Sequence, residues 1–268
     1  MKRFLSISLL FAAGLISPPA GAADMPVDLE LVLAVDVSRS IDEAEAELQR
    51  QGYIAAFRDP EVLRAIEHGI LGRIAVTYVE WAGAWHGDVV VGWTVIDGRE
   101  SAHAFADALD RRVPASARRT SIGGAIAFAA PLFGDNGFEG TRRTIDISGD
   151  GPNNDGPLVH VARDLAVAAG ITINGLPILD RNGGVFSWYS IPNLDLYYRD
   201  CVIGGPGAFI VVAEDFQDFA RAVRRKLLLE IAGLEPVLTL AQLRRDDRKS
   251  PPCDIGEQMR RAREEEDY

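Results

Sequence analysis

An alternation of short apolar runs with helix-like segments is the feature that most restricts how this chain can fold. The run LELVLAV at 29–35 has the length and composition of a buried β-strand, and residues 40–57 after it repeat apolar side chains at helical spacing. Further strand-like runs occupy 141–148, 171–179 and 208–213, and helix-like segments occupy 99–111, 121–132, 157–169 and 215–231. This order predicts an α/β fold with a doubly wound, mostly parallel central sheet and helices on both faces.

One pair of strand-like runs departs from this alternation. Residues 73–83 and 88–96 are separated only by a short turn around Trp85, His86 and Gly87, a spacing that predicts a β-hairpin. Because hairpin strands run in opposite directions, we expect one antiparallel edge strand on the otherwise parallel sheet.

The two ends of the chain differ in composition from the domain predicted between them, at 27–233. Residues 1–22 combine a basic start, an apolar stretch too short to span a bilayer and a small-residue end, the pattern of a signal peptide. We therefore expect a periplasmic or secreted protein with no membrane insertion after signal cleavage. Residues 234–268 mix charge blocks with proline, which predicts a solvated, partly disordered tail.

The formal net charge of the chain is −11. Nucleic acid and anionic lipid surfaces are therefore poor partners, whereas cations and basic proteins are better ones. The chain has two cysteines, Cys201 and Cys253, and an oxidising compartment permits them to pair. Whether they pair stays open, because Cys253 lies in the predicted tail, which need not reach Cys201.

Three predicted loops at one edge of the sheet are rich in side-chain oxygens. Ligands of open parallel sheets bind beyond the carboxyl ends of the strands, and the loops DVSRS, RRTSIGGAI and SGDGPNN are expected there. Their candidate ligands are Asp36, Ser38 and Ser40 in the first loop, Thr120 in the second and Asp150 in the third.

Carboxylates and hydroxyls without a thiol or an imidazole suit a hard cation, Mg²⁺ or Mn²⁺, rather than zinc. Neutral hydroxyl ligands leave such an ion electron-poor, which favours an incoming carboxylate as a further ligand. The set therefore indicates recognition of an acidic group more than catalysis.

Each loop also has a local interpretation that needs no metal. Ser40 and Glu43 have the spacing of a capping box, in which a serine hydroxyl and a glutamate satisfy the first N–H groups of a helix. Thr120 can be the N-cap of the next helix, and Asp150 can be a turn residue ahead of Gly151. The capping box does not account for Asp36 or Ser38.

Taken together, the three loops resemble the metal-ion-dependent adhesion site of von Willebrand factor type A domains. The motifs are D-x-S-x-S from Asp36, T-x-I-G-x-A-I from Thr120 and D-G at Asp150. The resemblance implies that Ser38 and Ser40 bind the ion directly, and that Thr120, Asp36 and Asp150 bind it directly or through water. Through the segment YYRDCVIGGPGAF at 197–209, the whole chain more closely resembles a family of exported bacterial proteins of unknown function with such a domain.

The chain departs from the usual pattern of these domains in two places. Arg118 and Arg119 precede the threonine where many relatives have small residues, and they either attract an anionic ligand or offset nearby acids. Asp146 and Ser148 occupy a strand that is usually wholly apolar.

A long connection at 181–207, rich in glycine and aromatic residues, follows a predicted parallel strand. It should therefore emerge at the edge that carries the oxygen-rich loops. Its aromatic side chains can form a partner-binding rim or can fold back over the core, and the sequence leaves both open. These side chains are Trp188, Tyr189, Tyr197 and Tyr198.

These features predict an exported, cation-dependent protein-binding module of the adhesion or scaffold type, which captures an acidic group of a protein partner. We do not expect an enzyme, because Asp36 or Asp150 would have to act as a general base while holding the ion. The alternatives are a metal-dependent hydrolase that uses the same ion and a domain whose metal is purely structural.

Overall fold

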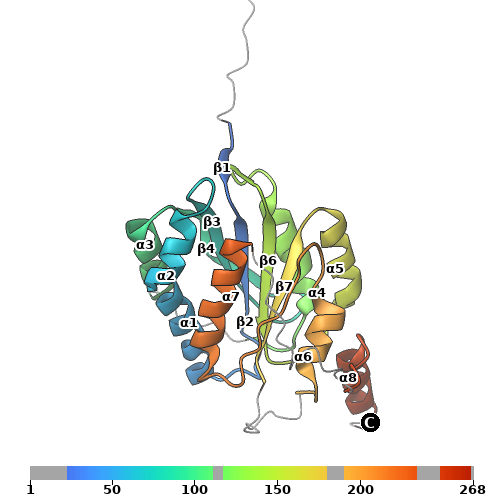
Figure 1. Cartoon of the computed structure of the whole chain (residues 1–268). Coiled ribbons are helices and arrows are strands. Elements are labelled where there is room, and N and C mark those ends of the chain that lie inside the picture. Colours follow the sequence, from blue (N-terminus) through green and yellow to red (C-terminus); the bar gives the residue numbers. More distant parts are fainter. Residues whose placement is uncertain (1–22, 111–116, 180–189, 234–247, 267–268) are drawn as a thin grey trace, which may run out of the picture.

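The computed structural model describes residues 23–110, 117–179, 190–233 and 248–266. A central sheet with strand order β4-β3-β2-β6-β7 is covered by helices on both faces (Figure 1). Its strands are β2 (Glu30–Asp36), β3 (Ile74–Trp81), β4 (Gly87–Ile96), β6 (Arg143–Gly149) and β7 (Thr172–Pro177). All neighbouring pairs are parallel except β3 and β4, which form the expected antiparallel hairpin. The predicted α/β fold, with one antiparallel edge strand, is confirmed.

The helices cover the sheet in two groups, each with its own apolar core. One group, with α1 (Glu43–Arg58), α2 (Pro60–Glu67), α3 (Arg99–Asp110) and α7 (Phe219–Ala232), packs on the face that receives Leu31, Leu33 and Val35 of β2. The other face receives Val32 and Ala34. Its elements are α4 (Ile122–Ala129), η1 (Ala130–Phe133), α5 (Val159–Ala168), α6 (Leu194–Tyr197) and the π-helical turn η3 (Tyr198–Val202).

The predicted strand at 208–213 is wrong as a continuous strand. The segment runs parallel to β7 but joins it only through isolated bridges, Gly175 with Ile210 and Ile178 with Ala213. The backbone N–H of Gly175 donates a hydrogen bond to this segment, and its carbonyl oxygen accepts one from it. Two residues further along β7, the backbone of Pro177 faces the same segment. Because proline has no N–H to donate, the hydrogen-bond ladder between β7 and the segment is interrupted there.

The polar side chain of Asp146 in β6 is explained by a buried ion pair with α7. The Lys226 ammonium lies 2.6 Å from the Asp146 carboxylate and also contacts Glu230 one turn along the helix. The Asn174 amide donates to Glu230 at 2.9 Å. Burial raises the pKa of Asp146 to about 7 against the opposing effect of Lys226. The charged cluster therefore ties α7 to the central strands.

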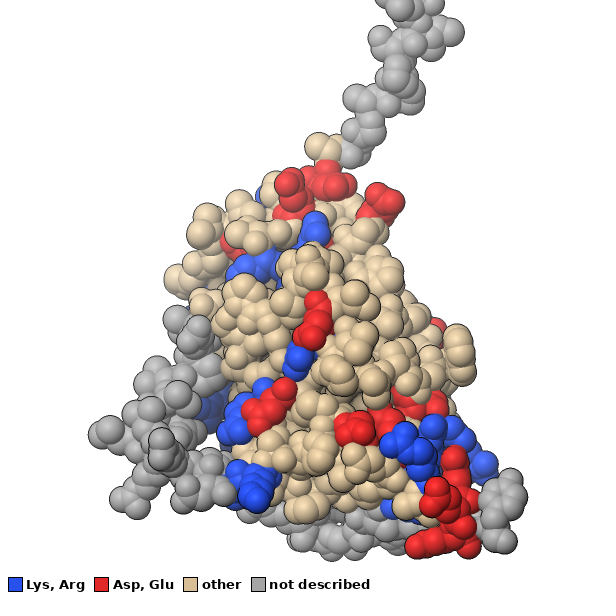
Figure 2. All heavy atoms as spheres, turned by 90° about the vertical axis from the view of Figure 1, so that its right-hand side faces the viewer, with Lys and Arg blue, Asp and Glu red and all other residues tan. Residues whose placement is uncertain are grey.

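The C-terminal segment 248–266 is ordered in the structure, which corrects the prediction of a solvated tail for this part of the chain. It carries α8 (Ile255–Glu266), whose first turn is buried at Gly256 and Glu257. Cys253, just before α8, is disulfide-bonded to Cys201. On the face shown in Figure 2, charged side chains gather at the lower end, where Figure 1 places α8. This packing was not foreseen because contacts between distant residues leave no local pattern.

A short parallel pair, β1 (Met25–Val27) with β5 (Phe138–Gly140), lies at the opposite end of the domain. In the part of the chain that the structure describes, no helix is long and apolar enough to cross a membrane. The predicted signal peptide, residues 1–22, lies outside the described residues, as does 234–247 of the predicted tail.

Candidate metal centre

Asp36, the last residue of β2, is fully buried at the carboxyl end of the central strand. Its Oδ1 accepts a hydrogen bond of 2.7 Å from the backbone N–H of Ser38, which turns the loop sharply as the strand ends. Its Oδ2 has no hydrogen-bond partner among the described residues. The first loop therefore presents one carboxylate oxygen that the described protein atoms leave unsatisfied.

A chain of hydroxyl contacts links the first loop to the other two. Thr120 Oγ1 lies 3.3 Å from Ser38 Oγ, and Ser38 Oγ lies 3.0 Å from Ser40 Oγ. Ser40 Oγ donates a hydrogen bond of 2.8 Å to Asp150 Oδ1. The structure thus brings all five predicted ligand residues together, although 110 positions separate Ser40 from Asp150.

The electrostatics of this group favour a cation. Burial raises the pKa of the Asp36 carboxyl well above its usual range, and the charge of Asp150 raises it further. The hydroxyl of Tyr198 is buried near Asp36 and also lacks a hydrogen-bond partner among the described residues. Interacting buried carboxylates with an unpaired oxygen are disfavoured unless a proton or a cation offsets their charge. The residues present therefore fit a hard divalent cation with oxygen ligands.

A metal here depends on hydroxyl oxygens as well as carboxylates. Among residues 23–110, 117–179, 190–233 and 248–266, no three His, Cys, Asp or Glu side chains cluster in a way that could hold a metal ion. A metal centre built from the described residues would therefore need hydroxyl ligands, which the oxygen-rich edge of the sheet provides.

The capping box predicted for Ser40 and Glu43 is wrong. Asp42 is the N-cap of α1, accepting from the Glu45 N–H at 2.8 Å while the Glu45 side chain accepts from the Asp42 N–H. The chain contains two overlapping D/S-x-x-E patterns, and the one with aspartate at the cap is formed. Ser40 is thereby left for the contact with Asp150.

The N-cap of α4 is Ser121 rather than Thr120, since the Ser121 hydroxyl accepts from the Gly124 N–H at 3.1 Å. Thr120, one residue earlier, is fixed through its backbone. Its N–H donates to the Asn154 side-chain oxygen at 3.0 Å, and its carbonyl accepts from the Asn154 N–H at 2.8 Å. Asn154 therefore fixes the backbone of the Thr120 loop.

Asn153 is a second organising residue that the sequence analysis missed. Its buried side chain accepts from the Gly123 N–H at 2.9 Å and donates to Glu257 of α8 at 2.7 Å. A Cβ at Gly123 would lie 2.2 Å from the Pro157 carbonyl oxygen, so only glycine allows this approach. The Asn-Asn pair that follows the sequence Asp150-Gly151-Pro152 is the signal that was available.

Comparison with known proteins supports the fold assignment. Residues 26–235 match the family described as "Protein of unknown function (DUF1194)". The chain belongs to this family. No curated protein matches it.

Solved structures relate this DUF1194 protein to von Willebrand factor type A domains. A von Willebrand factor type A protein from Catenulispora acidiphila aligns with a TM-score of 0.52 and 13% identity, over 76% of this chain and 43% of that one. Proximal thread matrix protein 1 from the mussel byssus aligns with a TM-score of 0.56 and 14% identity, over 79% of this chain and 49% of that one. Pilus adhesin SpaC from Lactobacillus rhamnosus GG aligns with a TM-score of 0.51 and 12% identity, over 78% of this chain and 31% of that one.

The chain spans about half the length of the mussel protein, and at these identities the likeness shows the fold alone. The expected membership of a family of unknown function with a von Willebrand type A fold is confirmed.

Of the four aromatic residues predicted as a possible partner-binding rim, the structure describes two, and these do not form one. Tyr197 and Tyr198 are fully buried, so for them the interpretation as a roof over the core is correct. The Tyr197 hydroxyl accepts from the Asn153 N–H at 3.1 Å and lies 3.3 Å from the Cys253 carbonyl oxygen. Trp188 and Tyr189 lie outside the described residues.

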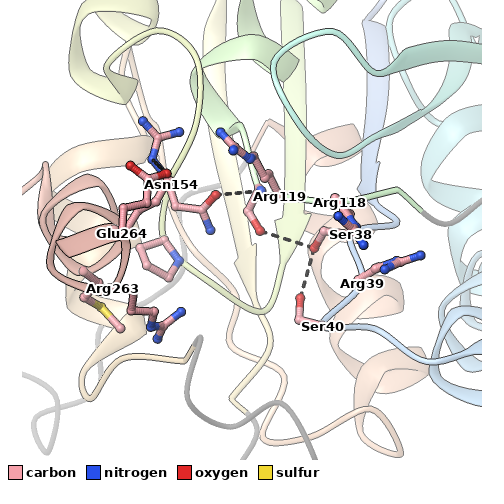
Figure 3. A pocket seen from close by; sticks show the side chains of 13 residues that line it. Ser38, Arg39, Ser40, Arg118, Arg119, Asn154, Arg263 and Glu264 are labelled. Carbon is pink, nitrogen blue, oxygen red and sulfur yellow. Dashed lines mark hydrogen bonds and ion pairs between the residues drawn. The ribbon is translucent and has the colours of Figure 1, made fainter. Parts of the chain in front are cut away.

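A pocket of about 460 Å³ opens beside the oxygen-rich loops of the domain (Figure 3). Ser38, Ser40 and Thr120 contribute to its lining from the loops, and α8 forms the facing wall. The two predicted arginines both line it but differ in their contacts. Both are exposed, but Arg119 forms an ion pair of 3.0 Å with Asp155 and so offsets an acid, whereas Arg118 has no ion pair with a described residue.

Proposed function

We propose that this chain is an exported protein-binding module of the adhesion or scaffold type that holds Mg²⁺ or Mn²⁺ and captures an acidic group of a protein partner. The observation that carries the proposal is the convergence of three oxygen-rich loops on a buried carboxylate with an unsatisfied oxygen. The proposed ligands of the ion are Asp36, Ser38, Ser40, Thr120 and Asp150.

In this proposal the bound ion supplies a Lewis-acidic centre that attracts a carboxylate. The chain's own residues hold it: Asp36 contributes negative charge from beneath the loop, and Asp150 contributes it from the end of β6. The Ser38 and Ser40 hydroxyls line the adjoining pocket, so a partner's side chain can approach from there. Binding is favoured over hydrolysis because the carboxylates that could serve as a base are the ones that hold the ion.

The names of similar proteins support this direction. The pilus protein is an adhesin, and the mussel protein is a thread matrix protein. One structure of the mussel protein is described as having a "zinc occupied MIDAS motif". We therefore include Zn²⁺ beside Mg²⁺ and Mn²⁺ in the test.

Calorimetric titration of the mature protein with each of the three ions tests the proposal. We expect binding that disappears in the Asp36→Ala/Asp150→Ala variant. It should persist in Glu100→Ala/Glu139→Ala, a control with the same charge change at exposed positions on α3 and β5. Equal binding of the ions by wild type and by the Asp36/Asp150 variant would contradict the proposal.

Affinity capture from a periplasmic extract, with and without a chelator, separates recognition from a purely structural metal. Capture of a partner that is lost on chelation supports recognition through the ion. If chelation instead lowers the melting temperature while capture is unchanged, the ion is structural.

A further inference from the structure

The first and second loops are joined by a short parallel bridge between Ser38 and Ala117. The Arg39 N–H donates to the Ala117 carbonyl at 2.9 Å, and the Ala117 N–H donates to the Val37 carbonyl at 3.2 Å. In a parallel bridge the next residues along the two segments are neighbours. Arg39 and Arg118 are therefore placed side by side next to a proposed metal ligand.

Arg39 and Arg118 differ from the other arginines around the pocket in their contacts. Arg119 and Arg260 both form ion pairs with the Asp155 carboxylate, at 3.0 and 2.8 Å. Arg39 and Arg118 are both exposed, and neither has an ion pair or side-chain hydrogen bond to a described residue. Two neighbouring guanidinium groups without a counter-charge repel each other. They form a local positive charge in a chain whose net charge is −11. This arrangement favours an anion from outside.

Both arginines line the pocket that contains Ser38, Ser40 and Thr120. Figure 3 shows Arg39 and Arg118 on the Ser38 side of this pocket, opposite Arg263 and Glu264 of α8. An anion bound by the arginine pair would thus lie beside the proposed ion, within the same 460 Å³ space. Guanidinium groups bind carboxylates in a planar, two-bond geometry that gives specificity as well as affinity.

We propose that Arg39 and Arg118 form a second anion subsite, which takes a second carboxylate of the same partner. The partner then presents a pair of acidic side chains, one for the ion and one for the arginines. This inference rests on the proposed function and narrows the partner to proteins with paired Asp or Glu residues.

The test compares two capped glycine-based peptides, one with a single glutamate and one with two glutamates, for binding to the Mn²⁺-loaded mature protein by calorimetry. We expect the second glutamate to tighten binding about tenfold. In Arg39→Gln/Arg118→Gln this gain should vanish, while Mn²⁺ and the single-glutamate peptide still bind. Spacers of increasing length between the glutamates give the preferred separation.

The control is Arg99→Gln, which removes one exposed arginine at the end of the sheet opposite to the metal loops. Arg99 follows the end of β4, where Ile96 pairs with Ile74 at the start of β3. The proposal is overturned if the double variant keeps the tenfold gain, or if Arg99→Gln loses it equally.

Failure of the proposed function has a different signature. In that case Mn²⁺ does not bind, and the single-glutamate peptide is insensitive to EDTA. The double-glutamate peptide in EDTA then tests the subsite by itself. Binding that is weakened by Arg39→Gln/Arg118→Gln supports the subsite, and binding that is unaffected overturns it.

Discussion

At the scale of single residues, the candidate site is defined by how closely Asp36 is enclosed. Its carboxylate lies under the backbone of Gly149, the last residue of β6. A Cβ built on Gly149 would lie 2.9 Å from Asp36 Oδ2 and 2.9 Å from the Tyr198 hydroxyl oxygen. A side chain at this position therefore competes with the carboxylate for space, while the backbone of Gly149 has an ordinary strand conformation.

The substitution Gly149→Ala is expected to displace the Asp36 carboxylate. Overpacking of this kind costs about 1–3 kcal/mol of unfolding free energy, and Mn²⁺ affinity should fall because a ligand moves. Gly92→Ala in β4 is the control, since a Cβ there meets no atom within 4 Å. Denaturant unfolding and Mn²⁺ titration measure the two effects. Unchanged Mn²⁺ affinity in Gly149→Ala would contradict this view of the site.

The raised pKa of Asp146 predicts a pH dependence of stability. A carboxyl whose pKa is about 7 in the folded protein and near 3.8 when exposed binds its proton more tightly in the folded state. Its contribution is fully present below the lower value and is lost as pH rises through about 7. We expect the unfolding free energy of wild type, relative to Asp146→Asn, to decrease as pH rises across this interval. A difference that is flat or increases with pH would contradict the assignment.

At the scale of elements, α7 is attached to β6 by a buried cation as well as by apolar packing. Lys226 is fully buried and contacts both Asp146 and Glu230. Arg142, just before β6, donates to the carbonyl oxygens of Glu230 and Ile231 at the end of α7, at 2.6 and 3.0 Å. Helix α7 is thus fixed at its middle and at its C-terminal end.

Lys226→Met should be strongly destabilising, because it leaves two buried acids without their cation. Removing one partner of a buried ion pair costs about 3–5 kcal/mol. Arg225→Met, at the adjacent exposed position of α7, is the matched control and should change stability little. Chemical denaturation monitored by circular dichroism compares the two variants. A cost as small as that of the control would show that apolar packing alone holds the helix.

Much of this element structure could be predicted from the sequence because its signals are local. Apolar periodicity and turn residues predicted the sheet, and the three loop motifs predicted that Asp36, Thr120 and Asp150 lie at one edge of it. The start of α1 was misplaced because two capping patterns overlap, and only packing decides between them. The contact of Asn153 with Glu257 spans 104 positions, and no short-range pattern reports such a contact.

At the scale of the whole molecule, the C-terminal segment completes the domain around the candidate site. Glu257 contacts Asn153, and Arg260 contacts Asp155, so α8 supports the loop that in turn fixes Thr120. Met259 and Arg263 of α8 form part of the pocket wall. The shape of the pocket thus depends on a segment remote in sequence from the metal loops.

The disulfide between Cys201 and Cys253 should keep this segment in place. In Cys201→Ser/Cys253→Ser, a link that closes a long loop is lost, and stability should fall by about 2–4 kcal/mol. Hydrogen exchange by mass spectrometry should become faster in 248–266 and in the loop around Asn153, while β2 and β3 keep their protection. The Glu257→Gln variant, which retains the disulfide, should leave exchange in 248–266 slow. Equal exchange in the double serine variant and wild type would show that side-chain contacts suffice to hold α8 against the site.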